Sequence, residues 1–167
     1  MASSKKPYCS FQNYVGGICS FARSDRKKKC TEIVSLLSCN KDISGHNKLL
    51  SISGITDEVD LILSRVEAFV ETDRSSSVVA QLTICPSHRF NLGLGWYRCS
   101  QKCRVPNQLS RHGPKPHNWP KAERGMGKTQ SQEILRKTGK FVPVGSGTVE
   151  CLLVLFYMKK IKCCCIF

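Results

Sequence analysis

The stretch Cys85–Cys103, which reads CPSHRFNLGLGWYRCSQKC, is the part of the sequence on which our reading of the fold depends. It holds three cysteines, one histidine, one tryptophan and a Gly-x-Gly turn, a combination found nowhere else in the chain. Thiol and imidazole groups at such close spacing are typical of small modules that a metal ion stabilises. We therefore predict a small α+β fold whose C-terminal module is irregular, metal-stapled and built with few short strands.

The spacing of these residues predicts a zinc site. Zinc prefers four sulfur or nitrogen ligands in a tetrahedron, and two ligands separated by two residues can bind one ion from a single turn. The pattern C-x2-H-x10-C-x3-C offers two such pairs, with Gly93 and Gly95 letting the chain reverse between them. The predicted ligands are Cys85, His88, Cys99 and Cys103. The alternative is that these cysteines are free thiols or buried side chains. His112 and His117, in a proline-rich loop, are spare ligand candidates.

A longer pattern extends this stretch: C-P-x-H-R-x-x-L-G-x-x-W, then a Cys, a Pro, a basic loop, a helix with Ser and Ile-Leu, and V-P-V-G-S-G. The matching residues are Cys85, Pro86, His88, Arg89, Leu92, Gly93, Trp96, Cys103, Pro106, Ser131, Ile134, Leu135 and Val142–Gly147. In this pattern the segment resembles a Cys/His, zinc-binding module of uncharacterised animal proteins. The resemblance implies that Cys85, His88 and Cys103 are ligands. It also implies a C-x-x-C pair after the final Gly-Ser-Gly, where this chain has only Cys151, so that Cys99 or Cys151 would supply the fourth ligand.

The N-terminal half predicts a helical hairpin. In residues 31–39, TEIVSLLSC, apolar side chains recur at helical spacing and Thr31 can cap the segment. In Thr56–Glu71 the apolar spacing persists over almost four turns, and acidic residues occupy the first turn, where the helix dipole favours negative charge. Thr56 is the predicted N-cap. The two apolar faces would bury each other, and a coiled-coil partner is the alternative.

The other segments are predicted from composition. Residues 1–30 are polar and basic, and Cys9 and Cys19 belong to no C-x-x-C pair, which predicts a weakly ordered arm without a zinc site. The polar stretch 72–78 is a linker, and Val78–Ile84 predicts a strand. The predicted divisions are the arm 1–30, a helical segment 31–71, a Cys/His basic module 79–147 and an apolar, Cys-rich tail 148–167.

Charge is concentrated in the second half of the chain. Residues 1–73 carry 10 Lys and Arg against 9 Asp and Glu, whereas residues 74–167 carry 16 against 3. This asymmetry indicates a partner such as nucleic acid, an acidic protein or an anionic membrane surface, and a solvated basic loop is the alternative. The cations predicted to contact phosphates are Arg124, Lys128, Arg136, Lys137 and Lys140. Trp96, Tyr97 and Trp119 lie among the cations and could stack on bases.

The segment Ala122–Thr129, AERGMGKT, matches the loose form of a phosphate-binding loop. Such a loop needs a buried strand before it and a helix after it. The helix is predicted over Gln130–Lys137, but the prolines of the preceding PKPHNWPK exclude the strand. Because no complete catalytic constellation is visible either, we predict that the protein is not an enzyme.

The tail supports a second hypothesis. The apolar run Cys151–Met158 is far shorter than the roughly 20 residues of a membrane-spanning helix. The last four residues, Cys164–Phe167, fit the C-a-a-X prenylation motif, and lysines precede them. In this alternative Cys164 carries the isoprenoid, and the protein is a peripheral membrane protein on the cytoplasmic face of a membrane. A chance match in non-native sequence is the other interpretation.

The predicted function follows from the cysteines and the charge. No apolar signal segment is present at the start of the chain, which favours a reducing compartment, the nucleus or the cytoplasm. In such a compartment clustered cysteines indicate metal binding before disulfides. We predict a non-enzymatic, zinc-stapled interaction module that binds nucleic acid or an acidic protein.

Overall fold

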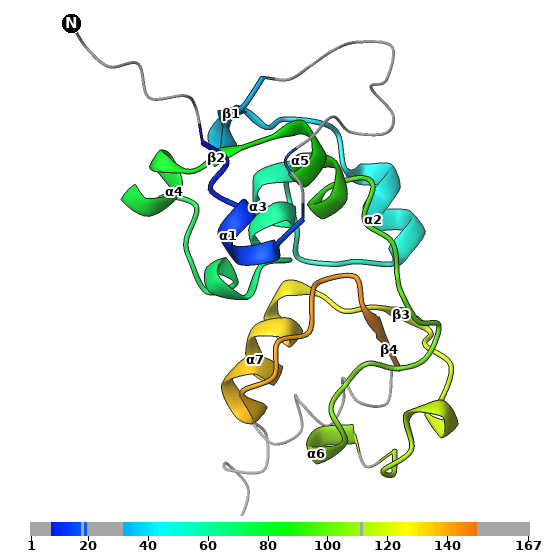
Figure 1. The fold of residues 1–167 in the computed structure, drawn as a ribbon. Helices are drawn as coiled ribbons and strands as arrows, with labels where there is room; N and C mark the ends of the chain where they lie inside the picture. The colour runs from blue at the N-terminus through cyan, green and yellow to red at the C-terminus, as the bar shows by residue number, and fades with distance from the viewer. Residues whose placement is uncertain (1–7, 18, 20–31, 111, 150–167) are drawn as a thin grey trace, which may run out of the picture. The chain divides into compact units, whose positions relative to one another are not determined.

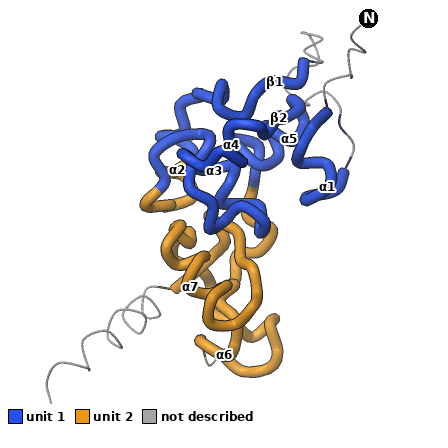
Figure 2. Tube along the Cα trace, turned by 90° about the vertical axis from the view of Figure 1, so that its left-hand side faces the viewer, with its two compact units in different colours: residues 1–46, 55–96 blue, residues 47–54, 97–167 orange. Residues whose placement is uncertain are grey.

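The computed structural model describes residues 8–17, 19, 32–110 and 112–149. These residues form seven α-helices, three short 3-10 helices and two antiparallel sheets of two strands each, so the predicted α+β class is confirmed (Figure 1). The chain divides into two compact units: unit 1 comprises residues 1–46 and 55–96, and unit 2 comprises residues 47–54 and 97–167 (Figure 2). This division does not coincide with the ranges predicted from composition, because the chain passes from unit 1 to unit 2 after Trp96.

Unit 1 is built from short elements around a two-stranded sheet. Strand β1 (Val34–Ser35) pairs antiparallel with β2 (Thr83–Ile84), with Val34 opposite Ile84. The helices of the unit are α1 (Gln12–Val15), η2 (Leu36–Ser38), α3 (Glu58–Leu63), η3 (Glu67–Phe69), α4 (Ser77–Gln81) and α5 (Pro86–Leu92). Helix α2 (Ser44–Leu50) begins in unit 1 and ends in unit 2.

The prediction of an α-helix over residues 31–39 is wrong for the part that the structure describes, residues 32–39. Long-range pairing replaces it, because β1 joins β2 and the Leu36 N–H donates to the Leu82 carbonyl at 2.8 Å. Only Leu36 of the predicted apolar face is fully buried, whereas Leu37 is 40% exposed. The predicted helical hairpin is therefore absent from the described part of this segment.

The strand predicted over Val78–Ile84 is correct only at its end. Residues before β2 form α4, because the Ser76 hydroxyl accepts a hydrogen bond from the Val78 N–H and caps a helix there.

Helix α3 is the short core of the helix predicted over Thr56–Glu71. Asp57, not Thr56, is the N-cap, since its side chain accepts from the Asp60 N–H at 3.0 Å. The helix ends at Ser64, whose hydroxyl donates to the Asp60 carbonyl, and the backbone is extended at Val66. The chain then makes η3. The residues of α3 buried in unit 1 are Glu58, Val59, Leu61, Ile62 and Leu63.

The N-terminal segment 8–17 contributes to the core of unit 1, contrary to the weakly ordered arm predicted for it. Phe11 is fully buried, and its ring meets Phe69 edge to face at a centroid distance of 5.7 Å. The backbone N–H of Ser10 donates to the Thr83 carbonyl at 2.9 Å. Hence the segment is held by both side-chain packing and backbone bonding. The rest of the predicted arm, residues 1–7, 18 and 20–30, lies outside the described residues.

A buried ion pair joins α3 to α5. The Glu58 carboxylate is 1% exposed and receives two hydrogen bonds from Arg89, from Nε at 2.9 Å and from Nη2 at 2.7 Å. The backbone N–H of Lys41 donates to the same carboxylate at 2.7 Å. Paired, bidentate contacts of this kind offset the desolvation of both charges and fix the relative orientation of two helices.

Arg65 closes the C-terminal end of α5. Its Nη1 donates to the carbonyls of Leu92 and Gly93, both at 2.7 Å, and its Nη2 lies 2.9 Å from Nε2 of His46. The guanidinium also stacks 4.3 Å from the ring centre of Trp96. Burial lowers the pKa of Arg65 to about 9. The carbonyls at the end of a helix lack hydrogen-bond donors within the helix, and Arg65 supplies a donor for two carbonyls at the end of α5.

Unit 2 has a smaller apolar core, and its regular elements include one helix of eleven residues and one two-stranded sheet. Strand β3 (Arg124–Gly125) pairs antiparallel with β4 (Gly147–Thr148), and α7 (Lys128–Thr138) follows β3. The shorter elements are α6 (Asn107–Ser110) and η4 (Pro116–Asn118). A side chain at Gly147 would clash, because its Cβ would lie 2.4 Å from that of Ala122. The buried core residues are Cys103, Val105, Met126, Ile134, Val142 and Val149.

Within the part of the chain that the structure describes, no helix has both the length and the apolar character needed to cross a bilayer.

Candidate metal centre

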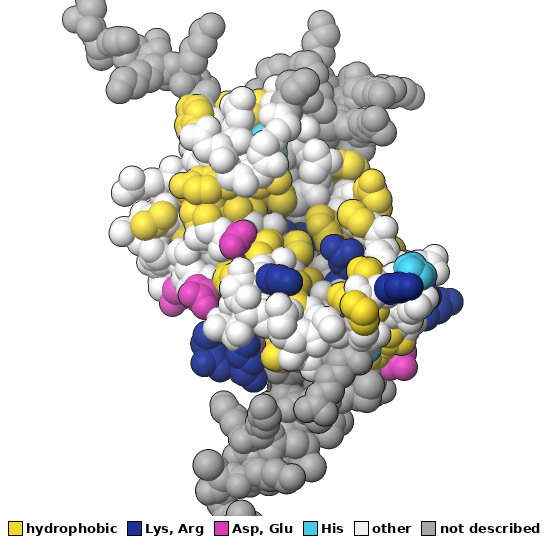
Figure 3. All heavy atoms as spheres, turned by 60° about the horizontal axis from the view of Figure 1, so that its bottom comes forward, with side chains coloured by type: hydrophobic (Ala, Val, Ile, Leu, Met, Phe, Trp, Pro, Cys, Tyr) yellow, Lys and Arg dark blue, Asp and Glu magenta, His cyan; other side chains and the backbone are white. Residues whose placement is uncertain are grey.

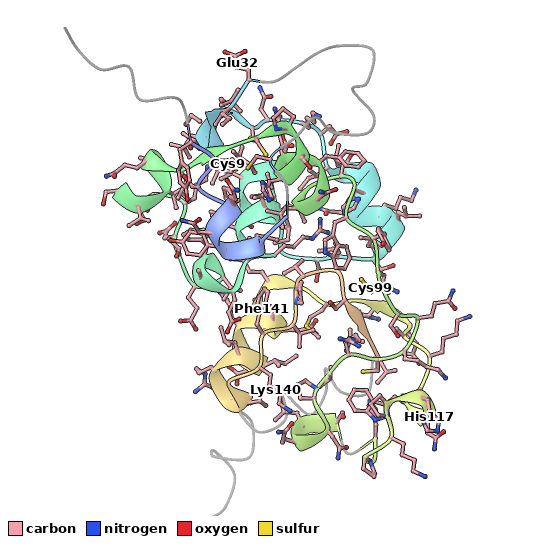
Figure 4. All side chains as sticks on the ribbon, viewed as in Figure 1. Cys9, Glu32, Cys99, His117, Lys140 and Phe141 are labelled. Carbon is pink, nitrogen blue, oxygen red and sulfur yellow. The ribbon has the colours of Figure 1, made fainter. Side chains whose placement is uncertain are left out.

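Four side chains of unit 1 converge on one point. The sulfur atoms of Cys9, Cys19 and Cys85 and a ring nitrogen of His88 all lie within 4.8 Å of one another. Cys9 precedes α1 and Cys19 follows it, whereas Cys85 and His88 come from the start of α5. In Figure 4 the label of Cys9 marks its place inside unit 1. The cluster therefore joins the N-terminal segment to α5.

The distances from His88 Nδ1 to the three sulfur atoms are compatible with one metal ion bound by all four side chains. Zinc binds sulfur at about 2.3 Å and nitrogen at about 2.0 Å, so tetrahedral angles place each sulfur about 3.5 Å from the nitrogen. The Nδ1 atom of His88 lies 3.1 Å from Cys85 Sγ, 3.4 Å from Cys9 Sγ and 3.7 Å from Cys19 Sγ. All three distances fall within a few tenths of an ångström of the expected value. The four side chains could therefore form a Cys3His site.

The second ring nitrogen of His88 has a partner that orients the imidazole. Nε2 lies 2.9 Å from the backbone carbonyl oxygen of Gly16, which can only accept, so we assign the ring proton to Nε2. Nδ1 is then the unprotonated nitrogen and faces the three sulfur atoms. Metal-bound histidines commonly donate their other N–H to a carbonyl in this manner.

Backbone amides support the sulfur atoms. The Cys85 N–H points at Cys9 Sγ, with a nitrogen–sulfur distance of 3.3 Å, and the His88 N–H points at Cys85 Sγ at 3.5 Å. Cys85 is the N-cap of α5 and Pro86 occupies its first turn, where proline is well tolerated. A capping residue and the residue three positions later face each other, so α5 itself brings Cys85 and His88 together.

Two thiols of the cluster, those of Cys19 and Cys85, have raised pKa values. Burial, a hydrogen bond with the Cys85 thiol and the charge of the neighbouring Cys9 raise the pKa of Cys19 to about 12. Burial also raises the pKa of Cys85, although the His88 N–H opposes it. A divalent metal ion would reverse this preference, because thiols bind metals as thiolates. Metal binding must therefore release protons and strengthen as the pH rises.

The structure assembles half of the predicted zinc quartet. Cys85 and His88 belong to the cluster, but its other members are Cys9 and Cys19 in place of Cys99 and Cys103. Cys99 is exposed, with its Sγ 3.9 Å from the Tyr97 carbonyl oxygen, and Figure 4 labels it on the chain of unit 2. Cys103 is fully buried in the apolar core of unit 2. Contrary to the expectation for the N-terminal arm, Cys9 and Cys19 belong to the cluster that could hold a metal ion.

The remaining ligand candidates have other surroundings. The His112 ring packs on Trp119 at a centroid distance of 5.8 Å, and burial lowers its pKa. His117 is exposed in η4. Cys151 and the predicted prenylation residue Cys164 lie outside the described residues.

Sequence reasoning missed Cys9 and Cys19 because their signal is not local. Cys9 is 79 positions from His88, and ten positions separate the two N-terminal cysteines. The available hint was the incomplete C-x2-H pair, which needs two thiols from elsewhere. Phe11 between the two cysteines was a second hint, since a buried aromatic residue requires the segment to dock.

The predicted phosphate-contacting cations lie along unit 2. Arg124 belongs to β3, Lys128 begins α7, and Lys140 follows α7 and is exposed (Figure 4). Arg136 and Lys137 bind Glu133, at 2.8 Å and 2.6 Å, and their hydrogen bonds lower the pKa of Glu133 to about 2. Part of the positive charge of α7 is therefore offset locally. On the face drawn in Figure 3 the Lys and Arg side chains form separate groups rather than one continuous stripe.

The predicted stacking aromatics are mostly engaged within the protein. Trp96 lies against Arg65, and Trp119 Nε1 donates to the Gly113 carbonyl at 2.9 Å. Tyr97 is 74% exposed and is accessible to a ligand.

The segment that matches a phosphate-binding loop borders a pocket of unit 2 with a volume of about 620 Å³. Strand β3 lies inside the motif rather than before it. The Gly127 N–H, which a phosphate cradle would use, donates instead to the side chain of Gln130 at 2.9 Å. This arrangement differs from that of a phosphate-binding loop, in which backbone amides face the ligand.

Comparison of the chain with protein families, with curated proteins and with solved structures finds no match.

Proposed function

We propose that the protein is a non-enzymatic interaction module in which one zinc ion staples the N-terminal segment to α5. The observation that carries this proposal is the convergence of three sulfur atoms and the unprotonated Nδ1 of His88 within 4.8 Å. A donor set of three thiolates and one imidazole at tetrahedral spacing suits zinc better than hard cations, which prefer oxygen.

The shape of the cluster supports a structural role. Four protein ligands complete a tetrahedron, whereas a catalytic zinc keeps one position open for water or substrate. Cys9, Cys85 and His88 are each at most 3% exposed, which leaves little access for a substrate. For these reasons we assign no catalytic step to the site.

The zinc would stabilise a segment that cannot fold alone. Helix α1 has four residues, far fewer than the roughly 12 that an isolated helix needs for even marginal stability. Phe11 and several hydrogen bonds, among them that of the Ser10 N–H to the Thr83 carbonyl, hold the segment in unit 1, and in this proposal two metal–sulfur bonds are added to them. Binding free energy of structural zinc acts directly as folding free energy.

The partner proposed for the module is nucleic acid, with an acidic protein as the alternative, and unit 2 would contact it. Residues 47–54 and 97–149 carry 12 Lys and Arg against 2 Asp and Glu, a formal net charge of +10. Of the predicted contact residues, Arg136, Lys137 and Lys140 are exposed, whereas Arg124 and Lys128 are partly buried. Such a charge attracts phosphates without reading a sequence.

Metal content of purified protein tests the zinc proposal. Protein prepared under reducing conditions should contain one zinc ion per chain, and Cys9→Ser or Cys85→Ser should lose it. Cys99→Ser is the matched control, because this exposed thiol of unit 2 lies outside the cluster. Zinc that is absent from the wild type, or lost from Cys99→Ser but retained by Cys9→Ser, contradicts the proposal.

The salt dependence of nucleic-acid binding tests the partner. If unit 2 contacts phosphates, the affinity for duplex DNA should fall steeply with salt, and each lost contact should reduce the log–log slope by about 0.9. Replacement of Lys128, Arg136, Lys137 and Lys140 by Gln should flatten the slope, whereas Lys41→Gln in unit 1 should not. No binding at low salt would exclude nucleic acid and favour the acidic protein.

A further inference from the structure

We infer that Cys19 and Cys85 form an oxidative modification site, at which a peroxide converts the metal staple into a disulfide staple. The inference rests on the proposed zinc site and adds a second state of the same cluster. In both states the N-terminal segment would remain joined to α5, first through the metal and then through a covalent bond.

Cys19 is the thiol that an oxidant in solution reaches first. It is only partly buried, and its Sγ makes an exposed contact with Gln12 Oε1 at 3.4 Å. Cys9 and Cys85 are 2% and 3% exposed. Bound to zinc, all three would be thiolates, the form that reacts with peroxides. Difference in access therefore selects Cys19 within the cluster.

Cys85 is the thiol that completes the disulfide. Both Cys85 and Cys9 lie within reach of the Cys19 thiol, but only Cys85 belongs to the start of α5, so only a bond to Cys85 would keep the N-terminal segment joined to that helix. All ligand atoms of the cluster lie within 4.8 Å, and a disulfide requires a sulfur–sulfur distance of about 2.05 Å. Cys19 lies after α1 and outside any helix or strand, so its side chain can approach without disrupting an element.

The reaction balances with hydrogen peroxide as the oxidant. The Cys19 thiolate attacks the peroxide, the oxygen–oxygen bond breaks, and a sulfenic acid and hydroxide form. The Cys85 thiolate then attacks the Cys19 sulfur, a sulfur–sulfur bond forms and a second hydroxide leaves. Two protons from the buffer convert the two hydroxides into water, so two thiolates, one peroxide and two protons yield one disulfide and two waters. The two remaining ligands, Cys9 and His88, cannot hold zinc, which is released.

Peroxide treatment of the full-length, zinc-loaded protein tests this inference. A chromogenic chelator should report release of one zinc ion per chain, and peptide mapping should find Cys19 linked to Cys85. A thiol reductant with added zinc should restore the starting state. The oxidised protein should also melt at a higher temperature than the reduced, chelated protein, because the disulfide replaces the staple.

Two ligand-preserving variants identify the reacting pair. Cys19→His keeps four ligands but lacks the thiol that reacts with peroxide, so zinc release by peroxide should slow by about an order of magnitude or more. Cys9→His also keeps four ligands but retains Cys19 and Cys85, so release should stay close to that of the wild type. If either variant fails to bind zinc, the peptide map of the wild type still decides the question.

The results that would overturn the inference differ from those that would overturn the zinc proposal. Untreated protein without zinc contradicts the zinc proposal itself. Zinc-loaded protein that keeps its metal while peroxide oxidises the exposed Cys99 contradicts only the present inference. Release of zinc with Cys9 linked to Cys85, or with no disulfide at all, also contradicts it.

Discussion

Unit 1 and unit 2 differ in charge and in the interactions that hold them together. Residues 1–46 and 55–96 carry 11 Lys and Arg against 9 Asp and Glu, whereas residues 47–54 and 97–149 carry 12 against 2. The nearly neutral unit 1 contains the Cys3His cluster and a buried ion pair. Among the described residues of unit 2 no group of three or more potential metal ligands occurs, and the unit has an apolar core of its own.

The side chains that could bind a metal ion lie in unit 1, whereas most of the excess positive charge of the described residues lies in unit 2. In unit 1 the buried charged side chains Glu58 and Arg65 are paired within the fold, Glu58 with Arg89 and Arg65 with the carbonyls of Leu92 and Gly93. In unit 2 many cations remain at the surface, where they repel one another and favour contact with an anion. The proposed zinc should accordingly matter for the folding of unit 1 and little for that of unit 2.

Chelation of zinc should produce the largest difference in stability between the two units. Removal of zinc should abolish the protection of backbone amides in α1 and α5 of unit 1, because structural zinc contributes about 10 kcal/mol or more in zinc-finger peptides. Protection in α7 of unit 2 should remain. Hydrogen exchange with and without a chelator measures both effects, and an equal loss in the two units would remove the distinction.

The buried ion pair should produce the next largest effect. Glu58→Gln removes the buried charge that faces Arg89, whose side chain is only 20% exposed, and breaking one partner of a buried pair costs about 3–5 kcal/mol. Glu133→Gln is the matched control in unit 2, since that pair is partly exposed and such pairs contribute about 0–1 kcal/mol. Denaturant unfolding of the zinc-loaded variants compares them. Similar losses from both substitutions would contradict the assigned difference in burial.

His46 should make unit 1 sensitive to mild acid. Burial, and secondarily the charge of Arg65, lower the pKa of His46, so the folded protein disfavours the protonated ring. The contribution of His46 is complete above its unfolded pKa of about 6.5 and is lost as the pH falls, with a slope of at most about 1.4 kcal/mol per pH unit for one proton.

His46→Gln is the control for this titration, because it retains an acceptor for Arg65 Nη2 and does not titrate near neutrality. The difference in unfolding free energy between wild type and variant should shift between pH 7 and pH 5, against the wild type. A pH-independent difference would show that His46 does not carry the effect.

The sequence predicted features that depend on neighbouring residues and missed features that depend on contacts between distant parts of the chain. The Cys85–His88 pair and the α+β class follow from spacing and composition, and the structure has both. The predicted helix at 31–39 fails because backbone bonds to residues 82–84 outweigh helical periodicity.

The candidate metal ligands illustrate the same limit of sequence patterns. No spacing rule links Cys9 and Cys19 to α5, because the fold alone brings them there. Conversely, Cys99 and Cys103 have ordinary ligand spacing, but one is exposed and the other is part of an apolar core. The spacing of two cysteines therefore shows only that they could bind the same ion. Whether their sulfur atoms come together depends on the surroundings of each side chain in the fold.

X-ray absorption at the zinc edge, on wild-type protein purified under reducing conditions, would identify the atoms that bind the metal. We expect three sulfur neighbours at about 2.3 Å and one nitrogen neighbour at about 2.0 Å, and the same spectrum for a Cys99→Ser, Cys103→Ser double variant. A change of ligand set in that variant, or a first coordination shell without nitrogen, would contradict a site formed by Cys9, Cys19, Cys85 and His88.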